Sequence, residues 1–155
     1  MNLLTLLLAV LFLPAQGAYA FDPIRADARL TPGMVDPDAT KEAICTAGYT
    51  KRVRHVPAKV KKEVYKRYRM APNASPCPCE VDHLISLELG GSNDIENLWP
   101  EPYGDEMGAR KKDVVENRLH KEVCNGAISL KRAQEIIGTD WTACYRTIKR
   151  GSDCR

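Results

Sequence analysis

Apolar residues recur along the chain with two different periods, which predict one hairpin among several helices. The stretch 80–99 has strand-compatible apolar residues on both sides of a dense turn signal, Gly-Gly-Ser-Asn-Asp at 90–94. This stretch therefore predicts two strands joined by a glycine turn, and Pro100 is expected to end the second strand.

Elsewhere in the chain, apolar residues that recur every three or four positions predict helices. Pro57 is expected to open a helix whose apolar stripe is Val56, Val60, Val64 and Tyr68. A second helix is expected from about Glu106 to Cys124, ended by Asn125-Gly126, with a core stripe of Val114, Val115, Leu119 and Val123. The tail 129–150 is predicted to be helical with Trp141 in the core, a kink at Gly138-Thr139, and Thr139 capping the helical segment after the kink. Together these elements predict a small α+β domain.

The first twenty residues carry no charge and hold a dense apolar run from Leu3 to Leu13. The run is short for a membrane span, and Ala18-Tyr19-Ala20 has the small-x-small form of a signal-peptidase site. We expect a signal peptide at 1–20, an irregular proline-rich arm at 21–40 and a single domain at 41–155. The mature protein is then secreted or periplasmic, with no membrane segment after signal removal.

Six cysteines, all in the expected mature part, predict disulfides in an oxidising compartment. They are Cys45, Cys77, Cys79, Cys124, Cys144 and Cys154. The sequence leaves all fifteen pairings open. Neighbours in a Cys-x-Cys pair rarely bridge each other, so Cys77 and Cys79 are expected to reach two different partners. The alternative for this pair is a structural zinc site, although zinc-binding pairs normally have a wider spacing.

The charge pattern inverts between two adjacent segments. Residues 41–69 hold ten Lys or Arg and two Glu, a net charge of +8, whereas residues 80–106 hold eight acidic residues and no Lys or Arg. The basic segment suits contact with a nucleic-acid backbone, through Lys61, Lys62, Lys66 and Arg67, or it is an ordinary solvated helix face. The acidic segment would repel a polyanion unless a cation intervenes; the alternative is an acidic loop that faces solvent.

Asp82 and His83 are adjacent at the head of the predicted hairpin. A carboxylate can hold a hard divalent cation, while an imidazole that titrates near neutrality can take a proton from water. Asn97 returns on the paired strand and is expected to orient the ring by a side-chain hydrogen bond. The structural alternative is a turn capped by Asp82 beside a hydrogen-bonded structural histidine.

These residues resemble the HNH endonuclease family. In the hairpin the resemblance rests on Asp82-His83, Gly90-Gly91 and Asn97-Leu98-Trp99-Pro100. It continues in Lys112-Asp113, Glu116-Asn117, Leu119-His120 and Val123-Cys124, similar to a secreted subgroup, so that it covers roughly Cys45 to Tyr145. The resemblance implies a ββα-metal motif, in which Asp82 and a helix residue hold one divalent ion, Mg²⁺ or Mn²⁺.

The sequence departs from the family at this helix residue, because no His or Asn lies nine to thirteen positions after Asn97. Glu106 is the expected substitute, with Glu116 and Asn117 as alternatives. Arg110 or Lys112 is expected to meet the scissile phosphate, unless these are ordinary surface charges. Glu116 and His120 share a helix face and could bind metal as a pair, or form a local ion pair or hydrogen bond.

The predicted function is metal-dependent hydrolysis of nucleic-acid phosphodiesters by a monomer, with DNA favoured over RNA as substrate. His83 is the general base and Asn97 holds it. A different class of function is a non-catalytic secreted nucleic-acid-binding module that has lost the metal. A third is a small disulfide-rich toxin or effector with a protein target.

Overall fold

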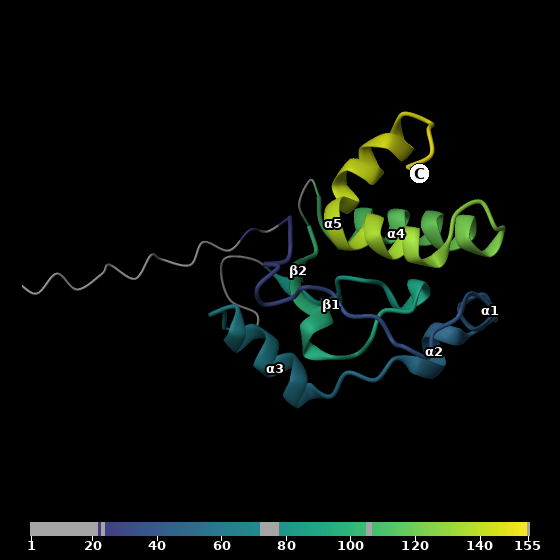
Figure 1. Cartoon of the computed structure of the whole chain (residues 1–155). Coiled ribbons are helices and arrows are strands. Elements are labelled where there is room, and N and C mark those ends of the chain that lie inside the picture. Colours follow the sequence, from purple (N-terminus) through teal and green to yellow (C-terminus); the bar gives the residue numbers. More distant parts are fainter. Residues whose placement is uncertain (1–21, 23, 72–77, 105–106, 155) are drawn as a thin grey trace, which may run out of the picture.

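The computed structural model describes residues 22, 24–71, 78–104 and 107–154, and it has a mixed α+β fold (Figure 1). The elements in chain order are α1 Lys41–Ile44, α2 Tyr49–Val53, α3 Ala58–Arg67, β1 Cys79–His83, η1 Leu87–Leu89, η2 Ile95–Asn97, β2 Leu98–Pro102, α4 Ala109–Cys124 and α5 Leu130–Lys149. The predicted class, a hairpin with flanking helices, is confirmed. The expected signal peptide lies outside the described residues. None of the described helices is long and apolar enough to cross a membrane.

Strands β1 and β2 form the predicted antiparallel hairpin, with Asp82 opposite Trp99 and His83 opposite Leu98. The prediction that Pro100 ends the second strand is wrong, because β2 continues to Pro102. A two-stranded sheet has only edge strands, and a proline is tolerated there when its missing N–H would point away from the partner. The two prolines of β2 alternate with Glu101, which leaves the intervening N–H groups for pairing.

The connection between the strands is longer than a tight turn and contains η1 and η2. Gly90 has a φ of 73°, and a Cβ on Gly91 would lie 1.7 Å from the carbonyl oxygen of Ile85, so both positions require glycine. The segment 24–40 runs over this connection, where Val35 bridges Gly91 and the Asp36 N–H donates to the Gly90 carbonyl at 2.8 Å. Within 24–40 the structure describes turns, bends and the single bridge at Val35, with no helix.

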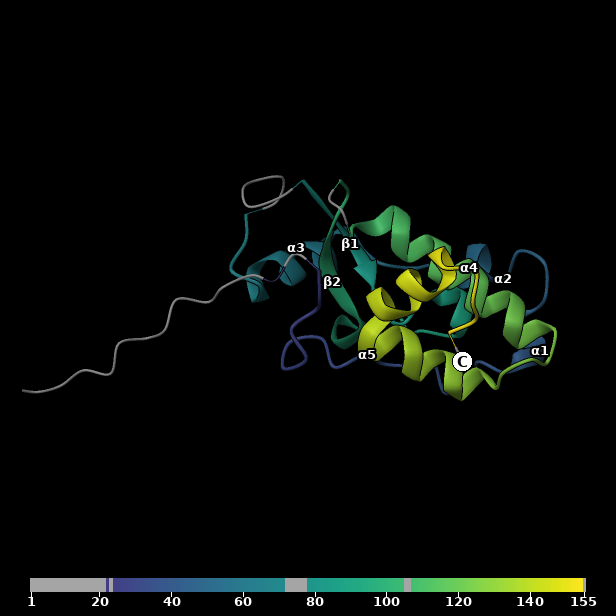
Figure 2. The same cartoon turned by 90° about the horizontal axis from the view of Figure 1, so that it is seen from above.

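The hairpin lies between α3 on one side and the pair α4 and α5 on the other (Figures 1 and 2). One core is formed where α4 and α5 pack on η1, and its fully buried members include Leu89, Val115, Leu119, Val123 and Ile137. A second core lies between α3 and the hairpin, around Val64, Tyr68, Leu98 and Trp99. Val114 was expected in the first core, but it is 43% exposed because it lies on the outer face of α4.

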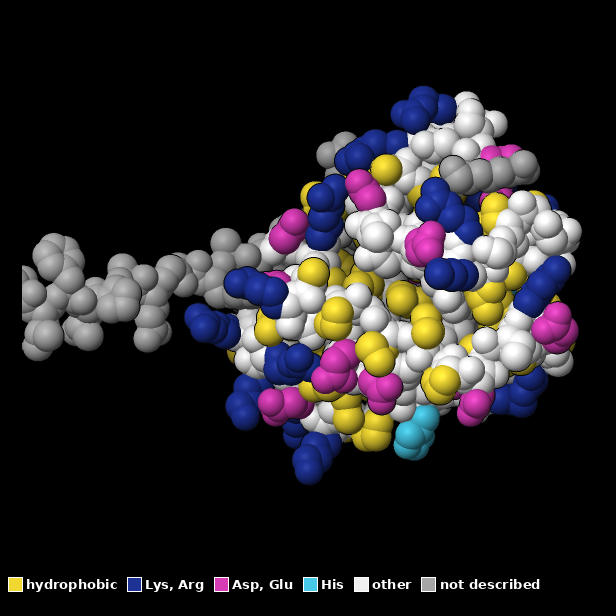
Figure 3. All heavy atoms as spheres, viewed as in Figure 1, with side chains coloured by type: hydrophobic (Ala, Val, Ile, Leu, Met, Phe, Trp, Pro, Cys, Tyr) yellow, Lys and Arg dark blue, Asp and Glu magenta, His cyan; other side chains and the backbone are white. Residues whose placement is uncertain are grey.

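Helix α3 begins directly after Pro57, as predicted, and turns Val56, Val60, Val64 and Tyr68 toward the second core. Its basic side chains lie on the other faces: Lys59, Lys61, Lys62 and Lys66 are exposed and Arg67 is half-buried. Figure 3 shows Lys and Arg side chains gathered over this helix on the lower left of the view, with a few acidic ones among them.

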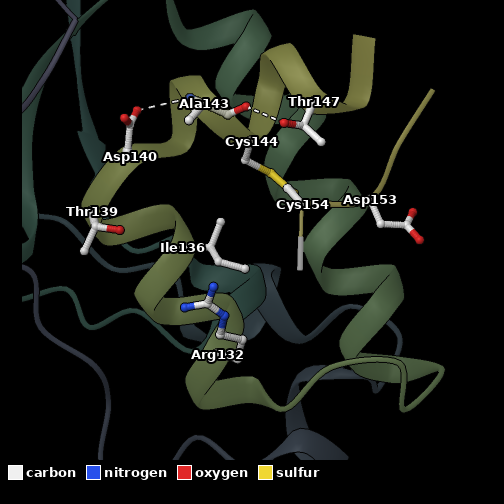
Figure 4. A pocket seen from close by; sticks show the side chains of 9 residues that line it. All are labelled: Arg132, Ile136, Thr139, Asp140, Ala143, Cys144, Thr147, Asp153 and Cys154. Carbon is white, nitrogen blue, oxygen red and sulfur yellow. Dashed lines mark hydrogen bonds between the residues drawn. A yellow bond between two sulfur atoms is a disulfide. The ribbon is translucent and has the colours of Figure 1, made fainter. Parts of the chain in front are cut away.

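Helix α5 bends at Asp140, which has non-helical backbone angles (φ −148°, ψ 72°). The Asp140 Oδ1 accepts a hydrogen bond from the Ala143 N–H at 3.1 Å, so Asp140 caps the second half of the helix (Figure 4). The bend was predicted slightly too early in the chain. Thr139 is not the cap, because its hydroxyl donates instead to the Glu135 carbonyl. Trp141 is buried, as predicted.

Two disulfides are described, Cys45–Cys124 and Cys144–Cys154. The first ties α1 to the end of α4, and the second holds the C-terminal segment against α5 (Figure 4). Cys79 is also disulfide-bonded. Cys45, Cys124, Cys144 and Cys154 pair among themselves. The expectation that Cys79 forms a disulfide with one of these four is therefore wrong. Cys77 lies outside the described residues.

Candidate functional site

The ammonium group of Lys112 lies at the centre of an acidic cluster formed by the hairpin and α4. Lys112 is fully buried. Its Nζ donates to Glu116 Oε1 at 2.5 Å, to the His83 carbonyl at 2.8 Å and to Asp82 Oδ2 at 3.2 Å, and it lies 3.4 Å from Glu101 Oε2. Helix α4 supplies the lysine and Glu116 one turn apart, and the two strands supply the other groups. We call Asp82, Glu101, Glu116 and Lys112 the acidic cluster.

The three carboxylates of the acidic cluster have different environments. Burial raises the pKa of Glu101 well above its usual range, and Asp82 adds to this effect while Lys112 opposes it. Burial alone would also raise the pKa of Asp82, but the Lys112 ammonium holds it well below its usual range. Glu116 accepts a further hydrogen bond from the Ser86 hydroxyl at 3.0 Å. Asp82 is therefore the ionised member that faces His83.

Asn93 fixes the tautomer of His83. The Asn93 Oδ1 accepts from the His55 backbone N–H at 3.1 Å and its Nδ2 donates to the Val53 carbonyl at 2.8 Å, so the orientation of the amide is determined. The His83 Nε2 lies 3.2 Å from the same Oδ1 and must donate to it. The lone pair of the neutral ring is then on Nδ1, which lies 3.6 Å from Asp82 Oδ1. His83 thus presents a proton acceptor to the acidic cluster.

Asn97 does not hold the imidazole, contrary to the prediction. Its side chain is fully buried and bonds the backbone, donating to the Ile85 and Ser92 carbonyls at 2.9 Å each and accepting from the Ile85 N–H at 2.9 Å. These bonds use both ends of the amide and fix the loop that follows β1. Asn97 is a structural residue, and it is Asn93 that accepts the hydrogen bond from the His83 ring.

The helix residues expected at the site are only partly brought together. Glu106 lies outside the described residues. Of the two alternatives, Glu116 joins the acidic cluster, whereas the Asn117 side chain is exposed and donates to the Asp113 carbonyl. Arg110 is exposed at the start of α4. Lys112 was expected to meet a phosphate, but its buried ammonium already contacts three carboxylates and cannot reach one.

The acidic cluster has the chemistry of a hard-cation site. Its donors are carboxylate and carbonyl oxygens, which suit Mg²⁺ or Mn²⁺. Both Glu101 oxygens are buried without a hydrogen-bond partner, which leaves acceptor capacity unused. Asp82 and Glu116 thus offer oxygen ligands of the kind that a divalent ion takes, and the Lys112 ammonium bonds to both of them.

Two residues of the site, Glu101 and Asn93, were missed from the sequence, and the burial of Lys112 beside Glu116 was not predicted. Glu101 shares a strand face with Trp99, which lies opposite Asp82, so the two-residue period could have placed it had β2 been extended past Pro100. Lys112 and Glu116 are one turn apart. This spacing predicts an ion pair between them, but it does not predict that the pair is buried. Asn93 had no signal beyond its place in the turn. Glu116 and His120 do not pair with each other: His120 Nε2 lies 3.1 Å from the Ile44 carbonyl oxygen.

Comparison with known proteins identifies no matching family model and no significantly similar curated protein or solved structure.

Proposed function

We propose that the protein is a metal-dependent endonuclease that hydrolyses phosphodiester bonds of nucleic acid. The observation that supports this most directly is the fixed tautomer of His83, whose Nδ1 lone pair faces the Asp82 carboxylate at the edge of an acidic cluster. A basic helix, α3, packs on the same hairpin. A proton acceptor, hard-cation ligands and a surface for phosphates are the groups that such a hydrolysis requires.

In this mechanism Nδ1 of His83 accepts a proton from the attacking water. Asn93 keeps the ring in the reactive tautomer, and Asp82 stabilises the imidazolium that forms, because its carboxylate lies 3.6 Å from Nδ1. The His83 side chain is 3% exposed, so water must approach Nδ1 beside Asp82, which is 22% exposed. A divalent ion held by Asp82 would supply charge stabilisation for the phosphate and the leaving oxygen.

The test is cleavage of plasmid DNA and of RNA by the purified protein, with and without EDTA. His83→Ala should lower the rate by roughly 10²–10⁴-fold while nucleic-acid binding is retained. His55→Ala is the matched control, because its side chain is exposed, and it should cleave normally. Asp82→Asn should recover part of its lost rate as the metal concentration rises. Full activity of His83→Ala at neutral pH would contradict the proposal.

The position of Lys112 favours one alternative, a nucleic-acid-binding module without catalysis. An ammonium already occupies the centre of the carboxylates, where it supplies part of the positive charge that an ion would bring. In that case the protein binds DNA through α3 and shows neither cleavage nor Mn²⁺ binding by calorimetry. Binding of one Mn²⁺ per chain together with EDTA-sensitive cleavage decides for the enzyme.

A further inference from the structure

A second group of potential ligands lies at the opposite end of α4 from its first turn. His120 and Cys124 are one turn apart on the same face of α4, and Cys45 caps the C-terminus of α1. The Cys45 and Cys124 Sγ atoms and a ring nitrogen of His120 lie within 4.8 Å of one another. The His120 Nε2 is 3.4 Å from Cys124 Sγ. Figure 2 shows α1 beside this end of α4.

These three side chains are reachable from solvent. Cys45 is exposed, and His120 and Cys124 are half-buried. Cys45 and His120 also line an open hollow of about 270 Å³, together with Tyr49, Glu88 and Asn117. The other described disulfide, Cys144–Cys154, is not part of any such group among the residues that the structure describes. Of the two described bridges, Cys45–Cys124 is therefore the one that has a third potential ligand, His120, and an open hollow beside it.

We propose that Cys45, Cys124 and His120 form a thiol-controlled site for a borderline-soft divalent ion such as Zn²⁺, which is created when the Cys45–Cys124 bridge is reduced. Two thiolates and one imidazole are the three protein ligands of one type of catalytic zinc site, and a fourth protein ligand would complete a structural one. Glu88, the carboxylate that lines the same hollow, is the candidate fourth ligand. The site is separate from the acidic cluster, whose oxygen ligands suit a harder ion, and it does not depend on nuclease activity.

The conversion balances with a dithiol as reductant. The dithiol gives two electrons and two protons to the bridge and becomes a disulfide itself, while Cys45 and Cys124 become thiols. Metal binding then releases both thiol protons. The His120 ring moves its proton from Nε2 to Nδ1 and gives up its contact with the Ile44 carbonyl, so that the Nε2 lone pair faces the two sulfurs. The bridge already holds the three ligand atoms within 4.8 Å of one another, and the two sulfurs separate once it is reduced.

The test uses Co²⁺, whose thiolate charge-transfer absorption reports bound cysteine directly. A chain with Cys77, Cys79, Cys144 and Cys154 changed to Ser retains only the Cys45–Cys124 pair and is reduced with a phosphine before titration. We expect one Co²⁺ per chain, displaced by Zn²⁺, and no absorption from the oxidised chain. His120→Ala should weaken Co²⁺ binding by roughly 10-fold or more. Changing Cys45 and Cys124 to Ser should abolish the absorption.

Circular dichroism and a titration in urea establish that binding requires the folded chain. The same His120→Ala comparison is made on the reduced chain with all six cysteines, so that the result does not depend on the multiple variant folding. Equal Co²⁺ affinity with and without His120 in both backgrounds overturns the proposal. So does a reduced chain that binds no Co²⁺, whether it stays folded or unfolds.

Discussion

Lys112 supplies the internal positive charge on which the acidic cluster depends. Replacing it by Met leaves three carboxylates without their shared cation, and breaking a buried ion pair from one side typically costs about 3–5 kcal/mol. We expect Lys112→Met to lower the free energy of unfolding by this amount in urea titrations. Lys121→Met is the control, since Lys121 is exposed in the last turn of the same helix, and it should change stability little. Equal losses in both variants would contradict the buried-charge interpretation.

Glu101 makes stability depend on pH. The folded protein keeps the proton of Glu101 to a higher pH than the unfolded chain does, because burial raises the folded pKa well above its usual range. The free energy of unfolding therefore falls as pH rises above the pKa of Glu in the unfolded chain, about 4.3, with a slope of up to about 1.4 kcal/mol per pH unit. Glu101→Gln should remove this slope.

The measurement is urea unfolding of both proteins between pH 5 and pH 7. The depressed pKa of Asp82 contributes stability that is present above its unfolded value, about 3.9, and is lost only on stronger acidification. The raised pKa of Lys112 contributes stability that is lost only well above this range. Parallel stability curves for the two proteins would show that Glu101 ionises normally in the fold.

At the scale of elements, sequence patterns predicted the features that local periodicity determines. The stripe Val56, Val60, Val64 and Tyr68 placed α3, and the apolar runs around the glycine turn placed both strands. The ends were less predictable. Pro100 stops a central strand but not an edge strand, and whether a strand lies at an edge depends on the whole sheet. Val114 and Val115 are adjacent, so the pattern alone did not decide which of them faces the core.

The site was predictable only where its residues are neighbours in sequence. Asp82 and His83 are adjacent, and the structure brings their side chains within 3.6 Å. The partners of these two residues come from distant segments: Asn93 from the connection, Glu101 from β2 and Lys112 from α4. A lysine is nearly always exposed, so the burial of Lys112 follows from three converging carboxylates and not from its own helix. Asn97 was assigned to the imidazole ring because the sequence does not show that its side-chain amide is fully used in hydrogen bonds to the loop backbone.

Helix α3 is predicted to bind nucleic acid through phosphate contacts. Changing Lys61, Lys62, Lys66 and Arg67 to Gln should weaken binding about equally for all sequences and flatten the dependence of binding on salt, since such contacts release counterions without reading bases. Fluorescence anisotropy at several salt concentrations measures both quantities.

The control for α3 removes the same number of positive charges from a different helix. It changes four exposed basic residues of α5 and its C-cap to Gln, namely Lys131, Arg146, Lys149 and Arg150. This variant should bind nucleic acid more tightly than the α3 variant does. Equal weakening in the two variants would make the effect one of net charge alone.

At the scale of the whole molecule, the two described bridges both join elements that pack around the core formed by α4 and α5. Both disulfides are consistent with a protein of an oxidising compartment. Cys45–Cys124 joins α1, which precedes the hairpin, to α4, which follows it. Cys144–Cys154 closes a local loop at the end of the chain. The two bridges should therefore contribute very different amounts to stability.

Loop-closure entropy gives the expected difference. The sequence separation is 79 residues for Cys45–Cys124 and 10 residues for Cys144–Cys154. In the chain-entropy model the first bridge stabilises by about 4.5 kcal/mol and the second by about 2.7 kcal/mol. Replacing each pair by Ser should thus lower the free energy of unfolding by amounts that differ by about 2 kcal/mol, measured in urea without reductant. If loss of the short bridge costs as much as loss of the long one, native-state contacts around Cys154 outweigh the effect of the bridges on the unfolded chain.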